Sequence, residues 1–357
     1  MKADGQSYAP KGKVKHVIEP GEFKVAAIGL DHGHIYGMCN GLSEAGAEIV
    51  LVYDPDPEKA EAFRQSFPGV RVAGSEQEVL ESDVKLVATA AIPSDRTGIG
   101  LRAMAYGKDF FADKTPLTQR KHLEEARAAV KSTKRKFFVY FSERLHVESA
   151  VYAEQLIEQG AIGKVVSVAG FGPHRLNAPS RPGWFFDPER NGGILLDIGS
   201  HQIEQILYFA GAKDAQIVSS RLANYNCKAH ETFYDYGDVT LTCDNGAAGY
   251  LRVDWFTPQG LGAWGDGRTT IVGTDGYIEL RKYIDVARDA EGDHVYMVNH
   301  EGEHHFKAAG RCGFPFFGRM IRDCLDRTET AMCQDHIFRS VELALDAQES
   351  AMVISQT

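Results

Sequence analysis

Short apolar runs alternate with longer amphipathic stretches through the first part of the chain. The apolar runs predict buried strands at residues 23–28, 48–53, 85–90, 109–112 and 136–141. The stretches between them predict helices from the turn after residue 28 to about residue 45, then at 57–66, 94–106 and 118–132. Because strands separated by helices of about 10–15 residues form β-α-β units, this part predicts a doubly wound parallel sheet, the Rossmann arrangement.

The pattern changes after a predicted helix at residues 148–158. Strand-like runs then follow one another with turn signals between them, as at Asp244-Asn245-Gly246 and Thr274-Asp275-Gly276. They occupy residues 164–172, 215–225, 232–243, 247–256, 268–273 and 277–283, with one helix at 196–209 and two later helices at 315–326 and 336–354. The fold class is therefore α/β plus α+β, with an open, mostly antiparallel sheet in the second part.

These patterns divide the chain into four parts. Residues 1–22 are polar, carry Pro10 and Pro20, and predict a flexible or surface-draped arm. Residues 23–145 form the Rossmann domain, and residues 146–335 form the α+β domain. Residues 336–357 predict a terminal helix that packs back on the first domain.

Composition excludes several classes of protein. The 357 residues are 43% hydrophobic and 25% charged, and Lys+Arg 39 against Asp+Glu 49 gives a net charge of −10, which argues against a nucleic-acid partner. The apolar runs are far shorter than the roughly 20 residues of a membrane-spanning helix, and no apolar signal segment precedes them. The six cysteines form no C-x-x-C pair, so we expect buried, reduced thiols and a cytoplasmic protein.

A glycine-containing turn follows the first predicted strand, where a Rossmann domain holds the pyrophosphate of a dinucleotide. It begins at Gly29, but Asp31 and His34 occupy the second and third glycine positions of G-x-G-x-x-G. Asp31 would repel phosphate unless it turns outward or caps the helix. His32 and His34 suggest a metal pair, but the sequence places no third ligand near them, so we predict no metal.

Asp54 ends the second predicted strand, 25 residues after Gly29. This spacing is close to that of the acid that binds the adenosine ribose, and a carboxylate there repels a 2′-phosphate. Asp54 therefore favours NAD over NADP. The alternative is that Asp54 is a helix N-cap before Pro55 and Pro57.

Three further side chains are candidates for a catalytic or ligand-binding role. Lys114 lies at the carboxyl end of a predicted parallel strand, the edge at which open α/β sheets bind ligands. Asp197 and His201 are four residues apart, which predicts a shared helix face, and glycines just upstream allow close approach to another element. The alternative is a helix cap and a core histidine.

The chain resembles the glucose–fructose oxidoreductase / inositol dehydrogenase / rhizopine catabolism (Gfo/Idh/MocA) family over nearly its whole length from Phe23. The resemblance is carried by AIGLDHGH, GKDFFADKTPLT, ERLH…EQGAIGKV and NGGILLDIGSHQI, in this order and spacing. It implies that Lys114, Asp197 and His201 match the residues that face the nicotinamide ring in this family. The chain departs from the family pattern at Arg96, Asp113, Thr115, Asn191 and Glu204.

The resemblance implies a nicotinamide cofactor, and the carboxylate of Asp54 favours NAD over NADP. The residues expected to hold it are Gly29, Asp31, His32, His34, Ile35, Asp54, Ile92 and Lys114. The chemistry of alcohol oxidation agrees with the implied catalytic residues. An imidazole with an ordinary pKa near ~6.5 is suited to accept the hydroxyl proton while hydride leaves the adjacent carbon. The ammonium of Lys114 would stabilise the charge that develops on the oxygen, and Asp197 would bind a neighbouring hydroxyl or raise the basicity of His201.

The candidate substrate residues combine hydrogen-bonding groups with an aromatic wall, the mixture that binds sugars. They are His174, Arg175, Asn177 and Trp184, together with Arg144, which resembles a family arginine near the domain junction. The alternative is a set of surface-loop polar groups beside a half-buried tryptophan.

We therefore expect an NAD-dependent dehydrogenase that oxidises a secondary hydroxyl of a sugar, glycoside or cyclitol. Two alternatives stay open: redox-neutral glycoside cleavage or elimination through a transient keto-sugar, and a non-catalytic ligand sensor of the same fold. The expected partners are a small carbohydrate or polyol and further copies of the chain, as a homodimer or homotetramer, with no nucleic acid and no membrane.

Overall fold

The structure is a computed structural model, and it describes residues 4–354. These residues form two compact units. One contains Gln6–Tyr140 and Phe314–Phe338, and the other contains Phe141–Gly313, the described residues from Arg339 onward and those before Gln6. Each unit is built on one sheet.

The first unit contains a six-stranded parallel sheet with the order β3-β2-β1-β4-β5-β6. This order is that of a Rossmann domain, so the predicted doubly wound sheet is confirmed. The strands are β1 (Lys24–Ile28), β2 (Glu48–Tyr53), β3 (Arg71–Val72), β4 (Leu86–Thr89), β5 (Asp109–Asp113) and β6 (Phe137–Tyr140). β1, β4, β5 and β6 are almost wholly buried apolar runs, as expected for strands covered on both faces.

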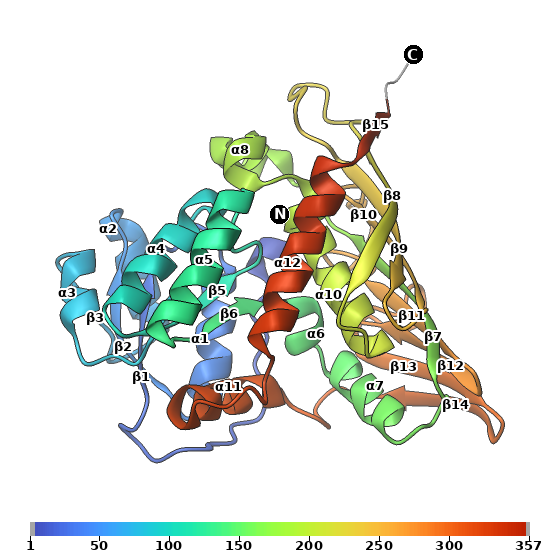
Figure 1. Cartoon of the computed structure of the whole chain (residues 1–357), viewed down its shortest axis with the longest axis horizontal. Coiled ribbons are helices and arrows are strands. Elements are labelled where there is room, and N and C mark those ends of the chain that lie inside the picture. The colour runs from blue at the N-terminus through green and yellow to red at the C-terminus, as the bar shows by residue number, and fades with distance from the viewer. Residues whose placement is uncertain (1–3, 355–357) are drawn as a thin grey trace. The chain divides into compact units, whose positions relative to one another are not determined.

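The helices of this unit flank the sheet (Figure 1). They are α1 (His34–Glu44), α2 (Pro57–Ser66), α3 (Glu76–Glu81), α4 (Pro93–Ala105), α5 (Arg120–Thr133) and α11 (Pro315–Asp326). α11 lies close against α1, because a Cβ at Gly41 would be 2.3 Å from the ring of Phe317. Aromatic contacts such as Phe110 with Phe137, 5.1 Å between centroids, fill the core.

The N-terminal residues of this unit run along α1. The backbone N–H groups of Lys15 and Val17 donate hydrogen bonds to the carbonyls of Glu44 and Ala45 at the end of the helix. At the start of the helix, a Cβ at Gly33 would be only 2.4 Å from the carbonyl oxygen of Gln6. The predicted flexible or surface-draped character of the arm stays a prediction.

The second unit contains a nine-stranded sheet with the order β14-β13-β12-β11-β7-β10-β9-β8-β15. Neighbouring strands are antiparallel except for β7 with β10 and β8 with β15, which confirms the mostly antiparallel prediction. The strands are β7 (Val165–Pro173), β8 (Ala215–Ala223), β9 (Tyr236–Cys243), β10 (Ala248–Asp254), β11 (Arg268–Gly273), β12 (Gly276–Arg281), β13 (His294–Asn299), β14 (Gly302–Lys307) and β15 (Met352–Ile354).

One helix of this unit, α10 (Gly199–Ala210), lies directly on β7. A Cβ at Gly170 or Gly172 would be 2.5 or 2.9 Å from the side-chain amide of Gln202, so glycine in the strand allows the helix to approach. The remaining helices in this part of the chain are α6 (Ser142–Leu145), α7 (Glu148–Glu158), α8 (Pro188–Asn191), α9 (Ile194–Asp197) and α12 (Gln334–Glu349). Figure 1 labels all of them except α9.

Several element boundaries differ from the sequence predictions. The helix predicted at residues 196–209 is two helices, α9 and α10, interrupted at Ile198. The predicted helix at 336–354 ends at Glu349, and the chain continues as β15. The β13–β14 hairpin was not predicted, because GEHHFK in β14 is too polar to be recognised as a strand from hydrophobicity alone.

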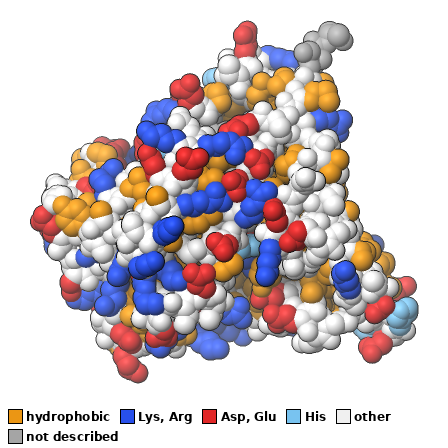
Figure 2. Space-filling view, in the orientation of Figure 1, with side chains coloured by type: hydrophobic (Ala, Val, Ile, Leu, Met, Phe, Trp, Pro, Cys, Tyr) orange, Lys and Arg blue, Asp and Glu red, His pale blue; other side chains and the backbone are white. Residues whose placement is uncertain are grey.

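The structure also tests predictions that were based on composition, namely those on surface charge, cysteines and membrane-spanning helices. Acidic and basic side chains are interspersed over the visible face in Figure 2. All six cysteines are free thiols, but the expectation that they are all buried is wrong, because Cys333 is exposed and Cys312 is half-buried. Within residues 4–354, none of the helices has both the length and the apolar character needed to span a bilayer.

Candidate functional site

The turn after β1 is tight because of Gly29. Its φ is +74°, a conformation that L-residues with a side chain rarely adopt, and a Cβ there would be 2.6 Å from the Cβ of Ala91. α1 then begins at His34 with Gly33 as its N-cap. Ile35 is buried in the first turn of α1, and its N–H donates to the carbonyl of His32 at 3.3 Å.

Asp54 holds this turn against the end of β2. One carboxylate oxygen accepts a hydrogen bond from the N–H of Leu30 at 2.7 Å, and the other accepts from the N–H of Asp56 at 2.9 Å. The alternative that Asp54 caps the next helix is wrong, because the N-cap of α2 is Asp56, whose side chain accepts from the N–H of Glu58. Each oxygen of Asp54 retains a lone pair for a further donor.

Asp31 is turned away from the start of α1. One of its oxygens forms an ion pair with the Nζ of Lys59 at 2.6 Å, and the other accepts from the N–H of Ile92 at 3.2 Å. Of the two ways in which Asp31 could avoid phosphate, the structure has the outward turn rather than the helix cap. Lys59 also neutralises its charge.

Arg96 organises the segment around Lys114. The guanidinium is 1% exposed and donates to the carbonyls of Ala91 at 2.7 Å, Thr115 at 2.9 Å and Lys114. It also forms an ion pair with Asp113 at 3.1 Å. The peptide bond between Lys114 and Thr115 is cis. Arg96, a departure from the family pattern, thus holds the backbone that presents Lys114.

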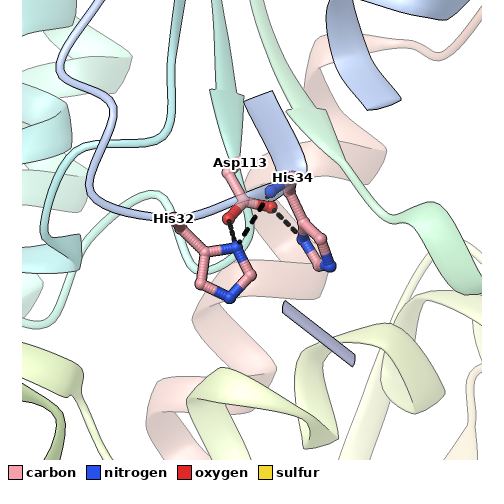
Figure 3. Close-up of side chains that lie close together, drawn as sticks. All are labelled: His32, His34 and Asp113. Carbon is pink, nitrogen blue, oxygen red and sulfur yellow. Dashed lines mark hydrogen bonds and ion pairs between the residues drawn. The ribbon is translucent and has the colours of Figure 1, made fainter. Parts of the chain in front are cut away.

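A cluster of His32, His34 and Asp113 adjoins Lys114 (Figure 3). The Asp113 carboxylate lies 2.9 Å from Nδ1 of His34 and 3.3 Å from Nδ1 of His32. Burial would raise the pKa of Asp113, but His34, Arg96 and His32 hold it well below its usual range. Burial and His34 hold the pKa of His32 well below its usual value, although Asp113 opposes them. Asp113 is therefore ionised and His32 is neutral near pH 7.

This cluster corrects one premise of the sequence analysis. A third candidate metal ligand does lie beside His32 and His34, because the ligand atoms of the three side chains are all within 4.8 Å of one another. The positive charge of Arg96 on the same carboxylate opposes a divalent cation there. The absence of a metal stays a prediction.

The second unit carries Asp197 and His201. Gly193, with φ +86°, lies so close to α12 that a Cβ would be 2.6 Å from the amide of Gln348, and that amide oxygen accepts from the N–H of Leu195 at 3.1 Å. This confirms the close approach expected at these glycines. Asp197 is the last residue of α9, and His201 is in the first turn of α10. The two therefore lie on successive helices joined at Ile198, whose φ and ψ are right-handed helical. Their shared face stays a prediction.

A buried charged network lies behind His201. Glu143, in α6, accepts a hydrogen bond from Gln202 Nε2 at 2.8 Å, and Lys282 Nζ lies 3.3 Å from the same carboxylate oxygen. Lys282 Nζ also donates to Gln205 Oε1 at 2.7 Å. Burial would raise the pKa of Glu143, but Lys282, His201, His174 and Gln202 lower it to about 2.

Two of the candidate substrate residues are engaged in structural contacts. Arg144 pairs with Glu204, 2.8 Å from its Nε to the carboxylate, and its guanidinium lies 3.6 Å from the ring centroid of Tyr208. Arg175 is 1% exposed, and it donates to the backbone carbonyls of Leu261 at 3.0 Å and Ala263 at 2.8 Å. These contacts join α6 to α10 and hold the loop after β10.

His174, immediately after β7, lies among aromatic rings. Its ring centroid is 4.4 Å from that of Trp264 and 5.5 Å from that of Trp255. Its Nδ1 is 3.1 Å from the carbonyl oxygen of Gly172, so Nδ1 carries a proton. Its Nε2 is 3.8 Å from the Oε1 of Glu143.

Asn177 and Trp184 complete the predicted set. Asn177 Nδ2 donates to Ser180 Oγ at 2.9 Å and lies 3.4 Å from the carboxylate of Asp4. The same carboxylate is 3.8 Å from Arg181. Trp184 is half-buried in a 3-10 turn (Gly183–Phe186), 6.2 Å from the ring of Phe185.

Sequence reasoning missed Glu143, Lys282 and Asp4. Glu143 and Arg144 are adjacent charged residues shortly after the apolar run of β6, and charges in that position signal a ligand-bearing strand end. Lys282 lies among other charged residues after β12, and Asp4 lies in the polar arm. No sequence feature at either position indicates a functional residue.

Comparison with known proteins shows which family and which solved structures the chain resembles. Residues 151–279 match the family model described as GFO/IDH/MocA C-terminal domain. A crystal structure from Erwinia carotovora atroseptica SCRI1043, of a protein assigned as an oxidoreductase, is 48% identical, with a TM-score of 0.91, and the match covers 94% of this chain and 100% of that one.

More distant structures share the fold. Myo-inositol 2-dehydrogenase from Lactobacillus plantarum is 18% identical, with a TM-score of 0.73, over 93% of this chain and 97% of that one. A 3-ketoreductase from Actinomadura kijaniata, in complex with NADP and TDP-benzene, is 17% identical, with a TM-score of 0.74, over 94% of this chain and 99% of that one.

Proposed function

Because the chain belongs to the Gfo/Idh/MocA family of oxidoreductases, we propose that it is an NAD-dependent dehydrogenase. Its proposed substrate is a secondary hydroxyl of a sugar, glycoside or cyclitol. The name of the Lactobacillus plantarum protein, a myo-inositol 2-dehydrogenase, supports this substrate class. The observation that carries the proposal is the placement of Lys114, held by Arg96 at the carboxyl end of β5 and beside the Gly29 turn.

The residues around the turn fit a dinucleotide. Gly29 allows the sharp bend that brings backbone close to a pyrophosphate, and Asp31 is neutralised by Lys59 rather than facing the start of α1. Asp54 has lone pairs left for the hydroxyls of the adenosine ribose, and its charge disfavours a 2′-phosphate. Gly29, Asp31, His32, His34, Ile35, Asp54, Ile92 and Lys114 are the residues that we propose to surround the cofactor.

A bound nicotinamide would supply the hydride acceptor. The chain's own residues would accept the hydroxyl proton and stabilise the charge that develops on the oxygen. His201 would accept the hydroxyl proton, and the ammonium of Lys114 would stabilise the oxygen as it loses that proton. Asp197 would bind a neighbouring hydroxyl or strengthen His201 as a base.

The candidate substrate residues divide into two groups on the structural evidence. His174, Asn177 and Trp184 retain the polar and aromatic character of a carbohydrate site, and His174 lies 3.8 Å from the buried carboxylate of Glu143. Arg144 binds Glu204 and Arg175 binds backbone carbonyls, so we propose that both stabilise the structure around the substrate site rather than contact the substrate. A homodimer or homotetramer in the cytoplasm remains part of the proposal.

The experiment is a spectrophotometric screen for NAD reduction over sugars, glycosides and inositols. Lys114→Met should reduce kcat by about a hundredfold or more and leave NADH binding within a few-fold of wild type. The matched control is Lys121→Met, on the exposed face of α5, which should behave as wild type. Turnover by Lys114→Met near the wild-type rate would show that the assigned role is wrong.

The same screen separates the two alternatives. A redox-neutral enzyme would convert a glycoside without accumulating NADH, which chromatography of the sugar products detects. A ligand sensor would bind nucleotide and polyol but convert neither.

A further inference from the structure

The second unit buries an ion pair in its core. Lys282, directly after β12, is 0% exposed, Glu143, in α6, is 2% exposed, and Lys282 Nζ lies 3.3 Å from Glu143 Oε2. Burial would raise the pKa of Glu143, but Lys282, more than any other neighbour, lowers it to about 2. Replacing such a pair by apolar side chains of similar volume is often neutral for stability, because the cost of taking two charges out of water offsets their attraction. Stability alone therefore does not account for the pair.

Each member of the pair holds one glutamine of α10. Glu143 Oε2 accepts a hydrogen bond from Gln202 Nε2 at 2.8 Å, and Lys282 Nζ donates to Gln205 Oε1 at 2.7 Å. Both glutamine side chains are buried. They follow His201 by one and four residues, so the pair engages the turn of α10 that begins at His201.

The contact between Lys282 and Gln205 extends to His201 itself. Thr269 Oγ1 also donates to Gln205 Oε1, at 3.2 Å, so the amide oxygen accepts from two donors. The amide nitrogen lies on the other side and donates to the backbone carbonyl of His201 at 2.9 Å. Lys282 therefore sets the orientation of an amide that is hydrogen-bonded to the main chain of His201.

Other elements of the second unit pack closely around the same turn. A Cβ at Gly170 or Gly172 would be 2.5 or 2.9 Å from the amide of Gln202, so β7 follows the shape of that side chain. Phe141, directly before α6, places its ring in a T-shaped contact with the imidazole of His201, 6.3 Å between centroids. The turn is thus held by β7, by the start of α6 and by the buried pair.

We propose that Lys282 and Glu143 are positioning residues for His201. By fixing the two glutamines, the pair holds the turn of α10, and with it the imidazole, in one orientation for proton transfer. This inference rests on the proposed function, because it gives the pair a task in presenting the proposed base. No bond forms or breaks at the pair.

The test replaces both members of the pair at once, because either single replacement would leave an unpaired charge in the core. Glu143→Leu/Lys282→Met keeps the side-chain volume close to that of wild type, so its Tm should stay within about 3 °C. With the sugars and inositols of the NAD-reduction screen, kcat should fall about tenfold or more while KM for NAD stays within about threefold. A merely structural role would lower Tm and leave kcat of the folded protein unchanged.

Amide hydrogen exchange, followed by mass spectrometry, reports on the same turn without any turnover. In the double variant, the peptide that contains residues 199–206 should exchange about tenfold faster, while peptides from β9 and β10 keep their wild-type rates.

Gln205→Leu provides a second variant, because it removes the link to the His201 carbonyl and leaves the ion pair in place. It should produce the same changes to a smaller degree, with kcat falling about threefold.

Glu291→Leu/Lys307→Met is the matched control. These two side chains form an ion pair of 2.6 Å in the same unit, but they are 72% and 39% exposed. The control should equal wild type in kcat and in exchange at residues 199–206. Circular dichroism of each variant reports whether it is folded.

The outcomes distinguish this inference from the proposed function. Wild-type kcat in the folded double variant, with or without faster exchange, overturns the positioning role and leaves the dehydrogenase untouched. Faster exchange at residues 199–206, without NAD reduction by wild type, shows that the pair holds the turn and overturns the dehydrogenase. If wild type does not reduce NAD and exchange is unchanged, both are wrong. If the double variant does not fold, Gln205→Leu decides, because wild-type kcat in that variant overturns the positioning role.

Discussion

Asp54 accepts a hydrogen bond from the N–H of Leu30 at 2.7 Å, across the gap between the second strand and the glycine turn. The proposed ribose-binding acid therefore also fixes the backbone of the turn beneath it. A substitution at Asp54 will change both the nucleotide preference and the shape of the turn. The two effects can be separated.

Asp54→Asn tests the nucleotide preference. It keeps an oxygen for Leu30 and removes the charge that repels a 2′-phosphate. The ratio of kcat/KM with NADP to kcat/KM with NAD should rise by about tenfold or more. Asp56→Asn, which weakens only the cap of α2, is the control. An unchanged ratio would mean that the ribose lies elsewhere.

Gly29→Ala tests the tightness of the turn. The alanine must adopt φ +74° and place its Cβ 2.6 Å from that of Ala91, so we expect a loss of about 3 kcal/mol in the free energy of unfolding. Gly21→Ala has a similar φ of +80° but nothing within 4 Å, so it should cost only about 1 kcal/mol. Urea denaturation measures both; equal losses would contradict the close contact.

Arg96→Lys tests how Lys114 is presented. Lysine cannot reproduce the forked contacts to the carbonyls of Ala91, Lys114 and Thr115. We expect kcat to fall at least about tenfold, with KM for the nucleotide changing much less. Arg102→Lys, on an exposed part of α4, serves as the reference. Full activity in Arg96→Lys would show that these contacts do not position Lys114.

The loss of stability at acid pH tests whether Glu143 is ionised in the folded protein. Its pKa is about 2 in the folded protein and near 4.5 in the unfolded chain. Because the folded value is depressed, its stabilising contribution is present above about pH 4.5 and is lost as pH falls from there to about 2. Glu143→Gln should therefore show a shallower fall in Tm over this range than wild type. Parallel curves would argue that Glu143 is protonated in the folded state.

Metal analysis tests the cluster of His32, His34 and Asp113. Because Arg96 already pairs with the carboxylate, we expect well under one equivalent of zinc, manganese or iron in the purified protein, and no loss of activity after EDTA treatment. A full equivalent that disappears in His34→Ala would instead establish a metal centre.

More of the fold than of the site could be predicted from the sequence. Apolar runs such as FKVAAI and EIVLVY are strands in any buried parallel sheet, and the helix at Pro57–Ser66 follows from its proline and periodicity. The site depends on contacts between residues distant in sequence. Nothing local to Lys282 indicates that it faces Glu143, 139 residues away, and nothing near His34 indicates Asp113, 79 residues away.

Periodicity also missed one helix boundary. Asp197 and His201 have the spacing of one helix face, but the helix ends at Asp197 and begins again at Gly199. Hydrophobic patterning does not reveal such a break, because the residues on either side of it, from Ile194 to Ala210, are nearly all buried.

The interruption at Ile198 has a practical consequence for anyone who transplants this carboxylate–imidazole pair into another scaffold. Copying only the D-x-x-x-H letters onto an uninterrupted host helix would reproduce the spacing without the break between α9 and α10. A faithful graft must include Ile198 as the junction of the two helices, together with Gly193 and its close contact with the side-chain amide of Gln348.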